Sequence, residues 1–247
     1  MSIKQAYINI LESASVSLAT GSASTSYPLY RVYDRDIGKN FRAGSTAKIE
    51  IVINQGTAGT VTDRLLIPVG HNLIGMSISL QNSTDGVTYA TAYSCTQADT
   101  ALINTTFATN IKQYWKLAIT SPNTVIPQLA EVFLTRDYTW ESDPYLYGAG
   151  PFENIFNVEN EVSVGGQDRF LVHGNAKKQR NYRLVGVDST QELNILSFNN
   201  VYGGAKPFWL FDHSSEWIYG KLVSPLNLKI EDRNIYSFDF NFLEVLP

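Results

Sequence analysis

Cysteine and charged residues are both scarce in this chain of 247 residues. The single cysteine, Cys95, has no partner within the chain, which excludes an internal disulfide framework and a cysteine metal cluster. We expect it to be a quiet, partly buried thiol. Charged residues make up 17% of the chain and hydrophobic residues 44%, so uncharged polar side chains must cover much of the surface. Such a surface suits packing against other subunits.

Dense positive charge is also missing. The net charge is -4, and the densest basic run is Lys177, Lys178, Arg180 and Arg183, which is typical of a solvated loop face. Binding to nucleic acid depends on clustered cations that neutralise phosphates. Nucleic acid is therefore not an expected partner.

The chain has no long apolar run. A membrane-spanning helix needs about 20 apolar residues, and the N-terminal segment M-S-I-K-Q-A-Y-I-N-I lacks the unbroken apolar region of a secretory signal. We therefore expect no membrane insertion, and synthesis and folding in a cytoplasm. The sequons at Asn82 and Asn104 are interpreted as turn residues.

No arrangement of residues typical of catalysis is present. The three histidines, His71, His173 and His213, are far apart and show no metal-binding spacing, and a structural hydrogen bond is expected for His71. Asp212 precedes His213, but neighbours on a strand point to opposite faces, which disfavours a catalytic pair. Phosphate-binding loops and nucleophile elbows are also missing. We expect no enzyme and no catalytic, cofactor-binding or metal-binding residues.

Acidic residues occur in several close pairs. Asp34 and Asp36 are spaced like ligands of a hard cation, but without further oxygen donors they are interpreted as turn-forming or arginine-paired carboxylates. Glu216, beside Trp217 and Tyr219, is the best candidate for a sugar contact in the C-terminal part. A structural role is favoured there as well.

Short strands separated by turns predict an all-β fold. The segment Val69–Ala92 reads as a β-hairpin, with Met76, Ile78 and Leu80 on one face and a turn at Asp85-Gly86. Further alternating strands are predicted, and they are Ala47–Asn54, Gln113–Thr120 and Leu129–Thr135. This order favours an antiparallel sandwich or jelly roll.

Four segments are expected along the chain. Residues 1–28, rich in Ser, Ala and Thr, form an N-terminal arm, and residues 29–140 form the sandwich. Residues 141–152 form an aromatic linker, and residues 153–247 a smaller β-rich domain with one helix and an aromatic core. A capping box from Ser189 to Glu192 places that helix at about 189–201.

Residues 29–136 contain a series of motifs in a defined order. They are D-R-D, F-R-A-G, K-I-E-I-V-I-N-Q-G, R-L-L-I-P-V-G-H-N-L-I-G-M-S-I-S-L-Q-N-S-T-D-G, Y-W-K-L-A-I-T and A-E-V-F-L. In this order they resemble a discoidin or galactose-binding-like domain. The resemblance implies a β-sandwich, and many proteins of that fold bind sugars. Trp115 falls at an inward-facing strand position, so it is interpreted as core rather than a sugar platform. No exposed aromatic with a polar fork can be picked out at one loop cluster.

The C-terminal part contains the segments K-P-F-W-L-F-D, W-I-Y-G-K-L-V-S-P and Y-S-F-D-F-N-F-L-E-V. With these segments it resembles domains of minor tail, tail-tip and baseplate proteins of tailed bacteriophages. It implies a structural virion protein that contacts copies of itself and other tail proteins, located in the virion tail and assembled in the host cytoplasm. The alternative is a carbohydrate-binding module for a host surface glycan.

Large aromatic residues are the candidates for contacts with a partner, because they are favoured at the centres of protein interfaces. The candidate partner-contact residues are Trp140, Tyr145, Tyr147, Phe152, Trp217 and Tyr219.

Overall fold

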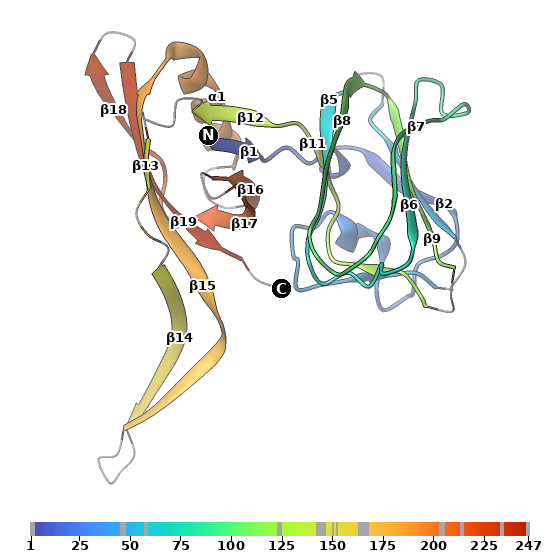
Figure 1. The fold of residues 1–247 in the computed structure, drawn as a ribbon, viewed down its shortest axis with the longest axis horizontal. Coiled ribbons are helices and arrows are strands. Elements are labelled where there is room, and N and C mark those ends of the chain that lie inside the picture. The colour runs from blue at the N-terminus through green and yellow to red at the C-terminus, as the bar shows by residue number, and fades with distance from the viewer. Residues whose placement is uncertain are drawn as a thin grey trace. The chain divides into compact units, whose positions relative to one another are not determined.

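The computed structural model describes residues 3–44, 48–56, 59–122, 125–141, 147–149, 151, 153–162, 168–202, 206–212, 215–232 and 235–245. The chain forms two compact units (Figure 1). Unit 1 is built from Met1–Tyr7 and Tyr138–Leu246, and unit 2 from Ile8–Asp137. Unit 2 is therefore an insertion between the first strand of unit 1 and the rest of that unit. Both units consist mainly of β-strands, which confirms the all-β class.

Unit 2 is a β-sandwich with a five-stranded and a three-stranded sheet. The larger sheet contains, in spatial order, β2 (Ser15–Thr20), β4 (Ile49–Asn54), β9 (Tyr114–Thr120), β6 (Ser77–Ser83) and β7 (Ala90–Thr96). The smaller sheet contains β11 (Phe133–Thr135), β5 (Val61–Ile67) and β8 (Ile103–Ile111). The short pair β3 (Phe41–Arg42) and β10 (Gln128–Leu129) and the 3-10 turns η1 (Ile10–Glu12) and η2 (Leu29–Val32) complete it.

The core of unit 2 follows the alternation of its strands. Residues two apart face the same side of a strand, so one apolar face of each central strand is removed from water. The large hydrophobic residues buried on β4, β6 and β9 are Ile49, Ile51, Ile53, Ile78, Leu80, Trp115, Leu117 and Ile119. Each fully buried side chain of this size stabilises the fold by about 1.5–3 kcal/mol. The interpretation of Trp115 as core is confirmed, because its side chain is fully buried.

The turn between β6 and β7 is stabilised by its own side chains. Asp85 Oδ1 accepts hydrogen bonds from the backbone N–H groups of Val87 and Thr88, both at 2.9 Å, and Gly86 has a φ of 73°. The Ser83 hydroxyl and these N–H groups lower the pKa of Asp85 to about 2. The hairpin predicted at Val69–Ala92 is thus part of the framework of the sandwich.

Unit 1 is organised around one nine-stranded sheet. In spatial order its main path is β12 (Tyr138–Glu141), β1 (Ile3–Ala6), β16 (Phe208–Phe211), β17 (Trp217–Leu222), β19 (Ile235–Glu244), β15 (Asp168–Val187) and β13 (Tyr147–Ala149). Strand β14 (Glu153–Val162) also pairs with β15, and β18 (Asn227–Asp232) with β19. Helix α1 (Ser189–Tyr202) follows β15.

An aromatic core fills unit 1. The ring of Trp140 lies 5.1 Å from that of Phe198 on α1 and 5.4 Å from that of Phe240 on β19. Phe208 lies 4.7 Å from Phe198 and 5.4 Å from Phe242. Such edge-to-face pairs add about 0.5–1.5 kcal/mol each beyond the area they bury. The predicted aromatic core is confirmed, and Trp140 is part of it.

The segment boundaries differ from the expected ones. Residues 1–28 do not form an arm, because Ile3–Ala6 pairs with β12 and β16, and Ser15–Thr20 pairs with β4. Partner strands remote in sequence supply the hydrogen bonds that the Ser/Ala/Thr-rich segment cannot make by itself. Of the linker expected at 141–152, the structure describes Glu141 as the end of β12 and residues 147–149 as β13, and 142–146, 150 and 152 lie outside the described residues.

Strand β15 is longer than expected. The sequence predicted separate strands at Asp168–His173 and Tyr182–Val187, whereas the structure has one strand of 20 residues. Its inner part, from Gln179 onward, pairs with β19, and its outer part pairs with β14 alone among the described residues. Figure 1 shows the β14–β15 hairpin extending well beyond the rest of the unit 1 sheet.

Helix α1 confirms the predicted helix, but its cap lies one residue earlier than predicted. Asp188 Oδ1 accepts hydrogen bonds at 2.8 Å from the N–H groups of both Thr190 and Gln191. Gln191 Oε1 accepts a hydrogen bond at 3.1 Å from the N–H of Asp188. The capping box therefore consists of Asp188 and Gln191, and the predicted box from Ser189 to Glu192 is wrong.

The position of the cap can be tested by substitution. Asp188→Ala removes the acceptor of two N–H groups and should lower the free energy of unfolding by about 1 kcal/mol. Ser189→Ala is the matched control and should change it by less than about 0.5 kcal/mol. Urea denaturation of both variants measures the difference. If Ser189→Ala lowered the free energy of unfolding more than Asp188→Ala, the capping box predicted from sequence, Ser189 to Glu192, would be the correct one.

Candidate functional site

His71 is the histidine whose side chain the structure describes, and its hydrogen bonds have a structural role. His71 is buried, and its Nε2 lies 2.9 Å from the carbonyl oxygen of Ala101. Its Nδ1 accepts a hydrogen bond from the N–H of Leu73 at 3.3 Å. This confirms the structural hydrogen bond predicted for His71. His213 lies outside the described residues, and the side chain of His173 is not described.

Asp212 is the centre of a buried polar cluster in unit 1. It accepts hydrogen bonds from Arg180 Nη1 at 2.5 Å and from the Tyr182 hydroxyl at 3.1 Å. Burial raises the pKa of Tyr182, and the negative charge of Asp212 raises it further. Removing one partner of such a pair destabilises a protein by about 3–5 kcal/mol, because the other charge stays buried. Asp212 therefore anchors β15 to the end of β16.

The described residues contain no group of three or more His, Cys, Asp or Glu side chains that could hold a metal ion. Asp36 forms an ion pair with Lys39 at 2.8 Å, and Asp34 Oδ1 accepts a hydrogen bond from the N–H of Asp36 at 3.0 Å. Of the two expected roles, the turn-forming one is confirmed for these aspartates, and the ion-pair partner of Asp36 is Lys39. Within the described part of the chain, no helix is long and apolar enough to span a membrane.

One loop of unit 2 brings exposed tyrosines and charged groups together. We name it the tyrosine loop, and it consists of Tyr27, Tyr30, Arg31, Asp34 and Lys39. The exposed fractions of Tyr27 and Tyr30 are 37% and 52%, and the Arg31 guanidinium carbon lies 5.5 Å from the centre of the Tyr27 ring. Burial raises the pKa of Asp34, and the negative charge of its neighbour Asp36 adds to this rise.

Arg31 of the tyrosine loop has spare hydrogen-bonding capacity. Its Nη1 donates to the carbonyl oxygen of Asn40 at 3.2 Å, whereas its Nε is buried and has no hydrogen-bond partner among the described residues. Sequence reasoning missed this aromatic and polar set because Tyr27 fell in the expected arm. The spacing of Tyr27 and Tyr30 around the turn η2 could have suggested it.

Glu131 is buried in a polar cluster where the chain enters and leaves unit 2. Its Oε1 accepts a hydrogen bond from Asn9 Nδ2 at 3.3 Å, and its Oε2 accepts one from the N–H of Arg35 at 2.9 Å. The Arg35 side chain forms an ion pair with Glu12. Both faces of this segment are covered, because Glu131 and its neighbours Ala130 and Val132 are all buried. Burial raises the pKa of Glu131 well above its usual value of 4.5, against the lowering effect of the Arg35 N–H.

The outer half of the β14–β15 hairpin is the candidate assembly surface. Among the described residues, Asn157–Val162 and Asp168–His173 pair only with each other. Near the base of the hairpin, Ile155 and Phe156 are 40% and 53% exposed. A two-stranded ribbon is at best marginally stable by itself in water, and unpaired strand edges are sites of strand addition.

The predicted partner contacts fall mainly inside unit 1. Trp140 is fully buried, and Trp217 and Tyr219 are 8% and 4% exposed. The described surface therefore offers none of these three rings to a partner, and no exposed ring flanks Glu216 for a sugar contact. Tyr147 lies in β13 with its side chain undescribed. The remaining two, Tyr145 and Phe152, lie outside the described residues.

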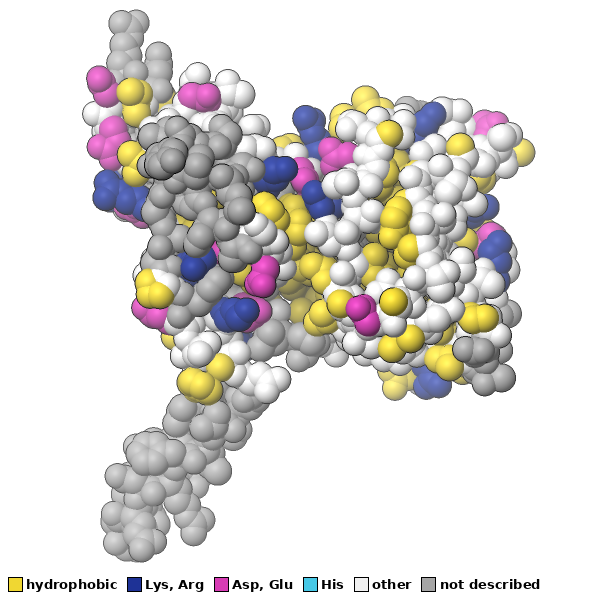
Figure 2. Space-filling model, viewed as in Figure 1, with side chains coloured by type: hydrophobic (Ala, Val, Ile, Leu, Met, Phe, Trp, Pro, Cys, Tyr) yellow, Lys and Arg dark blue, Asp and Glu magenta, His cyan; other side chains and the backbone are white. Residues whose placement is uncertain are grey.

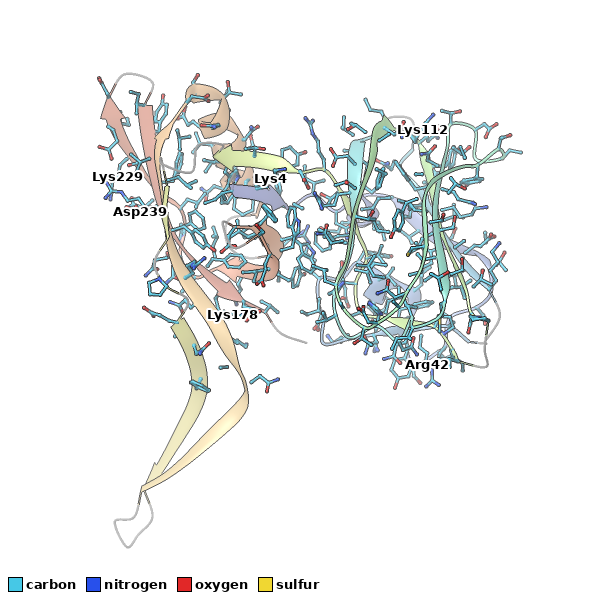
Figure 3. The ribbon with its side chains drawn as sticks, viewed as in Figure 1. Lys4, Arg42, Lys112, Lys178, Lys229 and Asp239 are labelled. Carbon is cyan, nitrogen blue, oxygen red and sulfur yellow. The ribbon has the colours of Figure 1, made fainter. Side chains whose placement is uncertain are left out.

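The face of unit 2 visible in Figure 2 is dominated by uncharged polar and hydrophobic groups. Strands β7 and β8 of unit 2 contain no Asp, Glu, Lys or Arg. Cys95 on β7 is a free, partly buried thiol, as expected. In unit 1, charge pairs occupy β18 and β19, where Lys229 forms an ion pair with Asp239 (Figure 3).

No protein-family model and no curated protein matches this chain. Solved structures similar to it include chitosan-binding module 1 of a chitosanase/glucanase from Paenibacillus sp. IK-5, with 16% identity, 53% of this chain and 100% of that chain covered, and a TM-score of 0.46. Module 2 of that enzyme, in complex with chitotriose, has 18% identity, covers 52% and 100%, and has a TM-score of 0.45. CBM32-1 from a family 31 glycoside hydrolase of Clostridium perfringens has 18% identity, covers 53% and 99%, and has a TM-score of 0.43.

The buried Glu131 predicts a defined pH dependence of stability. Because its pKa is raised in the folded state, its contribution is complete below the unfolded value of 4.5 and is lost as the pH rises through the folded value. Glu131→Gln removes this titration. The free energy of unfolding of the wild type minus that of the variant should therefore decrease as the pH rises above 4.5. Urea denaturation at several pH values measures it, and a difference that grows with pH would contradict the raised pKa.

Proposed function

We propose that this protein is a structural subunit of a homo-oligomeric assembly, and specifically a tail-tip, baseplate or minor tail protein of a tailed bacteriophage. The observation that carries the assembly role is the β14–β15 hairpin, whose outer half pairs with no third strand among the described residues. Figure 1 shows this hairpin extending well beyond the rest of the unit 1 sheet. Its function in the assembly is to hold neighbouring subunits together. Unit 2 is an inserted domain of this subunit.

The physical reason lies in the outer half of this hairpin, Asn157–Val162 with Asp168–His173, whose outer edges pair with no other strand among the described residues. A buried or paired edge stabilises a ribbon through backbone hydrogen bonds, and an isolated ribbon lacks both a third strand and a covered face. Exposed Ile155 and Phe156 add apolar area at its base. A neighbouring subunit that pairs with the ribbon gains these interactions, so assembly accounts for its length.

The bacteriophage assignment rests on the resemblance of the segments K-P-F-W-L-F-D, W-I-Y-G-K-L-V-S-P and Y-S-F-D-F-N-F-L-E-V. These segments correspond to β16, β17 and β19, the strands that form the aromatic core of unit 1. The proposal places the protein in the virion tail, in contact with copies of itself and with other tail proteins. Detection of the protein in purified phage particles by mass spectrometry is the direct test of the bacteriophage assignment.

Shortening the hairpin tests the assembly role. Asn157 and His173 are paired in register, so replacing residues 158–172 by Asn-Gly closes the hairpin with a two-residue turn. We expect the shortened protein to be monomeric at concentrations where the full chain forms oligomers. Size-exclusion chromatography with light scattering measures the molar mass of the shortened protein and of the full chain.

The shortened hairpin keeps the inner part of β15 and the Arg180–Asp212 pair, so its thermal unfolding should resemble that of the full chain. Equal oligomer masses for the shortened and full chains would contradict the assembly role of the hairpin. A wild-type chain that stays monomeric and is missing from virions would contradict the proposed function as a whole.

A second candidate function is recognition of a host surface glycan by unit 2. The observation that favours it is the tyrosine loop, where exposed Tyr30 and Tyr27 adjoin the cationic Arg31 and the carboxylate of Asp34. Aromatic rings provide an apolar platform, and the charged groups beside them can hydrogen-bond to hydroxyl groups. This arrangement is the aromatic and polar set that glycan recognition requires.

Tyrosine substitutions test the glycan site. A glycan array on the wild-type chain identifies the ligand, and calorimetric titration then compares variants. Tyr30→Ala and Tyr27→Ala should each weaken binding by about three- to ten-fold, because each removes one stacking surface. Ile111→Ala, at an exposed position of β8, is the control and should leave binding unchanged. The absence of any glycan binding, or equal effects of all three variants, would exclude the tyrosine loop as the site.

A further inference from the structure

We infer that β18 of one copy pairs antiparallel with β18 of a second copy, around a two-fold axis at Ile230. The partner of this strand is thus a second copy of the same chain. The inference goes beyond the proposed function, because it adds a contact at an edge of the unit 1 sheet that does not involve the β14–β15 hairpin. Three features of β18 lead to it, namely its position at the edge, its exposed apolar face and the order of its charges.

Strand β18 lies at an edge of the unit 1 sheet (Figure 1). All its residues are exposed, and in the described chain β19 is the strand with which it pairs. In an antiparallel pair, alternate residues direct their N–H and C=O groups away from the partner strand. The outward groups between Asn227 and Glu231 therefore offer backbone hydrogen bonds to a strand of another molecule.

One face of β18 is apolar and continues the face of the sheet on which α1 packs. Leu228 lies opposite Phe238 in register, and Ile230 lies opposite Tyr236, whose hydroxyl donates a hydrogen bond to Glu192 of α1. Phe238 is fully buried, whereas the exposed fraction of Ile230 is 74%. The cover that α1 provides therefore ends before Ile230. A second copy at this edge would place its own Ile230 against this side chain and remove apolar surface of both from water.

The other face of β18 is charged. Lys229 forms an ion pair with Asp239 of β19 (Figure 3), and the Glu231 carboxylate accepts a hydrogen bond from the Ser237 hydroxyl at 2.6 Å. Ser237 lies opposite Lys229 in register, so Lys229 and Glu231 share this face although the register shifts near the end of β18. Arg183 of β15 lies 3.9 Å from Glu231. A positive and a negative charge therefore follow each other along this face of the edge strand.

The order of these charges favours one register of β18 with itself. Residues directly opposite each other in a sheet share a face, so the two-fold axis passes beside a residue. With the axis at Ile230, Lys229 of each copy lies opposite Glu231 of the other, and Ile230 lies opposite Ile230. An axis at Lys229 would oppose two lysines, and an axis at Glu231 would oppose two glutamates, which destabilises strand pairs. Charges that commonly protect an edge strand from pairing thus select a single register here.

The contact is isologous, because the same edge of both copies takes part, and it closes after two copies. It is also short, so we expect it to be weaker than the contact made by the β14–β15 hairpin. Covalent trapping is the measurement suited to a weak contact. The chain with the shortened hairpin keeps β18 and should be trapped as well.

Cross-linking at the axis tests the pairing in the full chain. Opposite residues of an antiparallel pair have Cα atoms about 4.5–5.5 Å apart, which a disulfide can span. Ile230→Cys in a Cys95→Ser background should therefore give a disulfide-linked dimer on mild oxidation, visible by non-reducing electrophoresis. Val223→Cys in the same background is the matched control, because Val223 is an exposed apolar residue of unit 1 outside β18. It should give little dimer.

Charge reversal identifies the register. Added to the cross-linking chain, Lys229→Glu opposes carboxylates across the axis and Glu231→Lys opposes ammonium groups, so each variant alone should give about five-fold less dimer. An equal mixture of the two variants again opposes unlike charges. It should recover to within about two-fold of the parent chain, as dimers between differently tagged variants. Damage to folding would persist in the mixture, so recovery reports contact between the copies.

Lys221→Glu is the control for the reversal of charge. It changes the net charge as Lys229→Glu does, at an exposed position of β17 outside β18, and should leave the yield of dimer unchanged. Circular dichroism should show that every variant is folded.

The outcomes separate this pairing from the proposed function. If Ile230→Cys gives no more dimer than Val223→Cys while the wild type forms oligomers, the β18 pairing is wrong and the assembly role of the hairpin stays. A mixture of the two charge variants that does not recover also overturns the pairing. If Ile230→Cys is trapped and the mixture recovers, while shortening the hairpin leaves the oligomer mass unchanged, the β18 pairing stands and the assembly role of the hairpin is wrong.

Discussion

The antiparallel pairing of β1 with β12 is the constraint on which the organisation of the chain depends. It brings residues 3–6 of the chain beside residues that follow a long insertion, and the rings of Tyr7 and Tyr138 lie 4.9 Å apart. The chain therefore leaves unit 1 on one strand and returns on the neighbouring strand, a geometry in which domain insertions are tolerated. Within unit 2, the Asn9 side chain donates to the carbonyl oxygen of Val132 at 2.8 Å and accepts from the N–H of Leu134 at 3.3 Å. The incoming and outgoing segments are thus joined inside unit 2 as well.

Strand β15 combines a fixed inner part with an outer part that has few partners. The inner part is paired with β19 and β13, and the Arg180–Asp212 pair fixes it to the end of β16. Fixing one end of a ribbon in advance lowers the entropy lost when a second subunit binds it. The proposed role in assembly follows from this contrast, and glycan recognition by the tyrosine loop would add a second activity on a separate unit.

The framework of unit 2 was predictable because it repeats a local pattern. Alternation with period two placed Ile78, Leu80 and Trp115 in the core, and the structure confirms all three. Candidate site residues were less predictable. The large aromatic ring of Trp140 suggested a contact with a partner protein, but this ring is fully buried in unit 1. The residues that cover it, such as Phe198 and Phe240, follow it in the chain by many residues. The tyrosine loop escaped notice for the converse reason, since the exposure of Tyr27 depends on how its segment packs.

By itself, the sequence determined the all-β class, the alternating strands of the sandwich, the hairpin turn at Asp85-Gly86 and the helix that ends at Tyr202, because each depends on neighbouring residues in the chain. Only the tertiary structure decided that residues 3–6 belong to the C-terminal unit, that β15 is continuous, and that Glu131 is buried. Strand pairing joins residues far apart in sequence, and the burial of a side chain depends on the side chains of these remote strands. Local patterns do not encode either property, so the extension of the β14–β15 hairpin beyond the part of β15 that pairs with β19 emerges only from the folded chain.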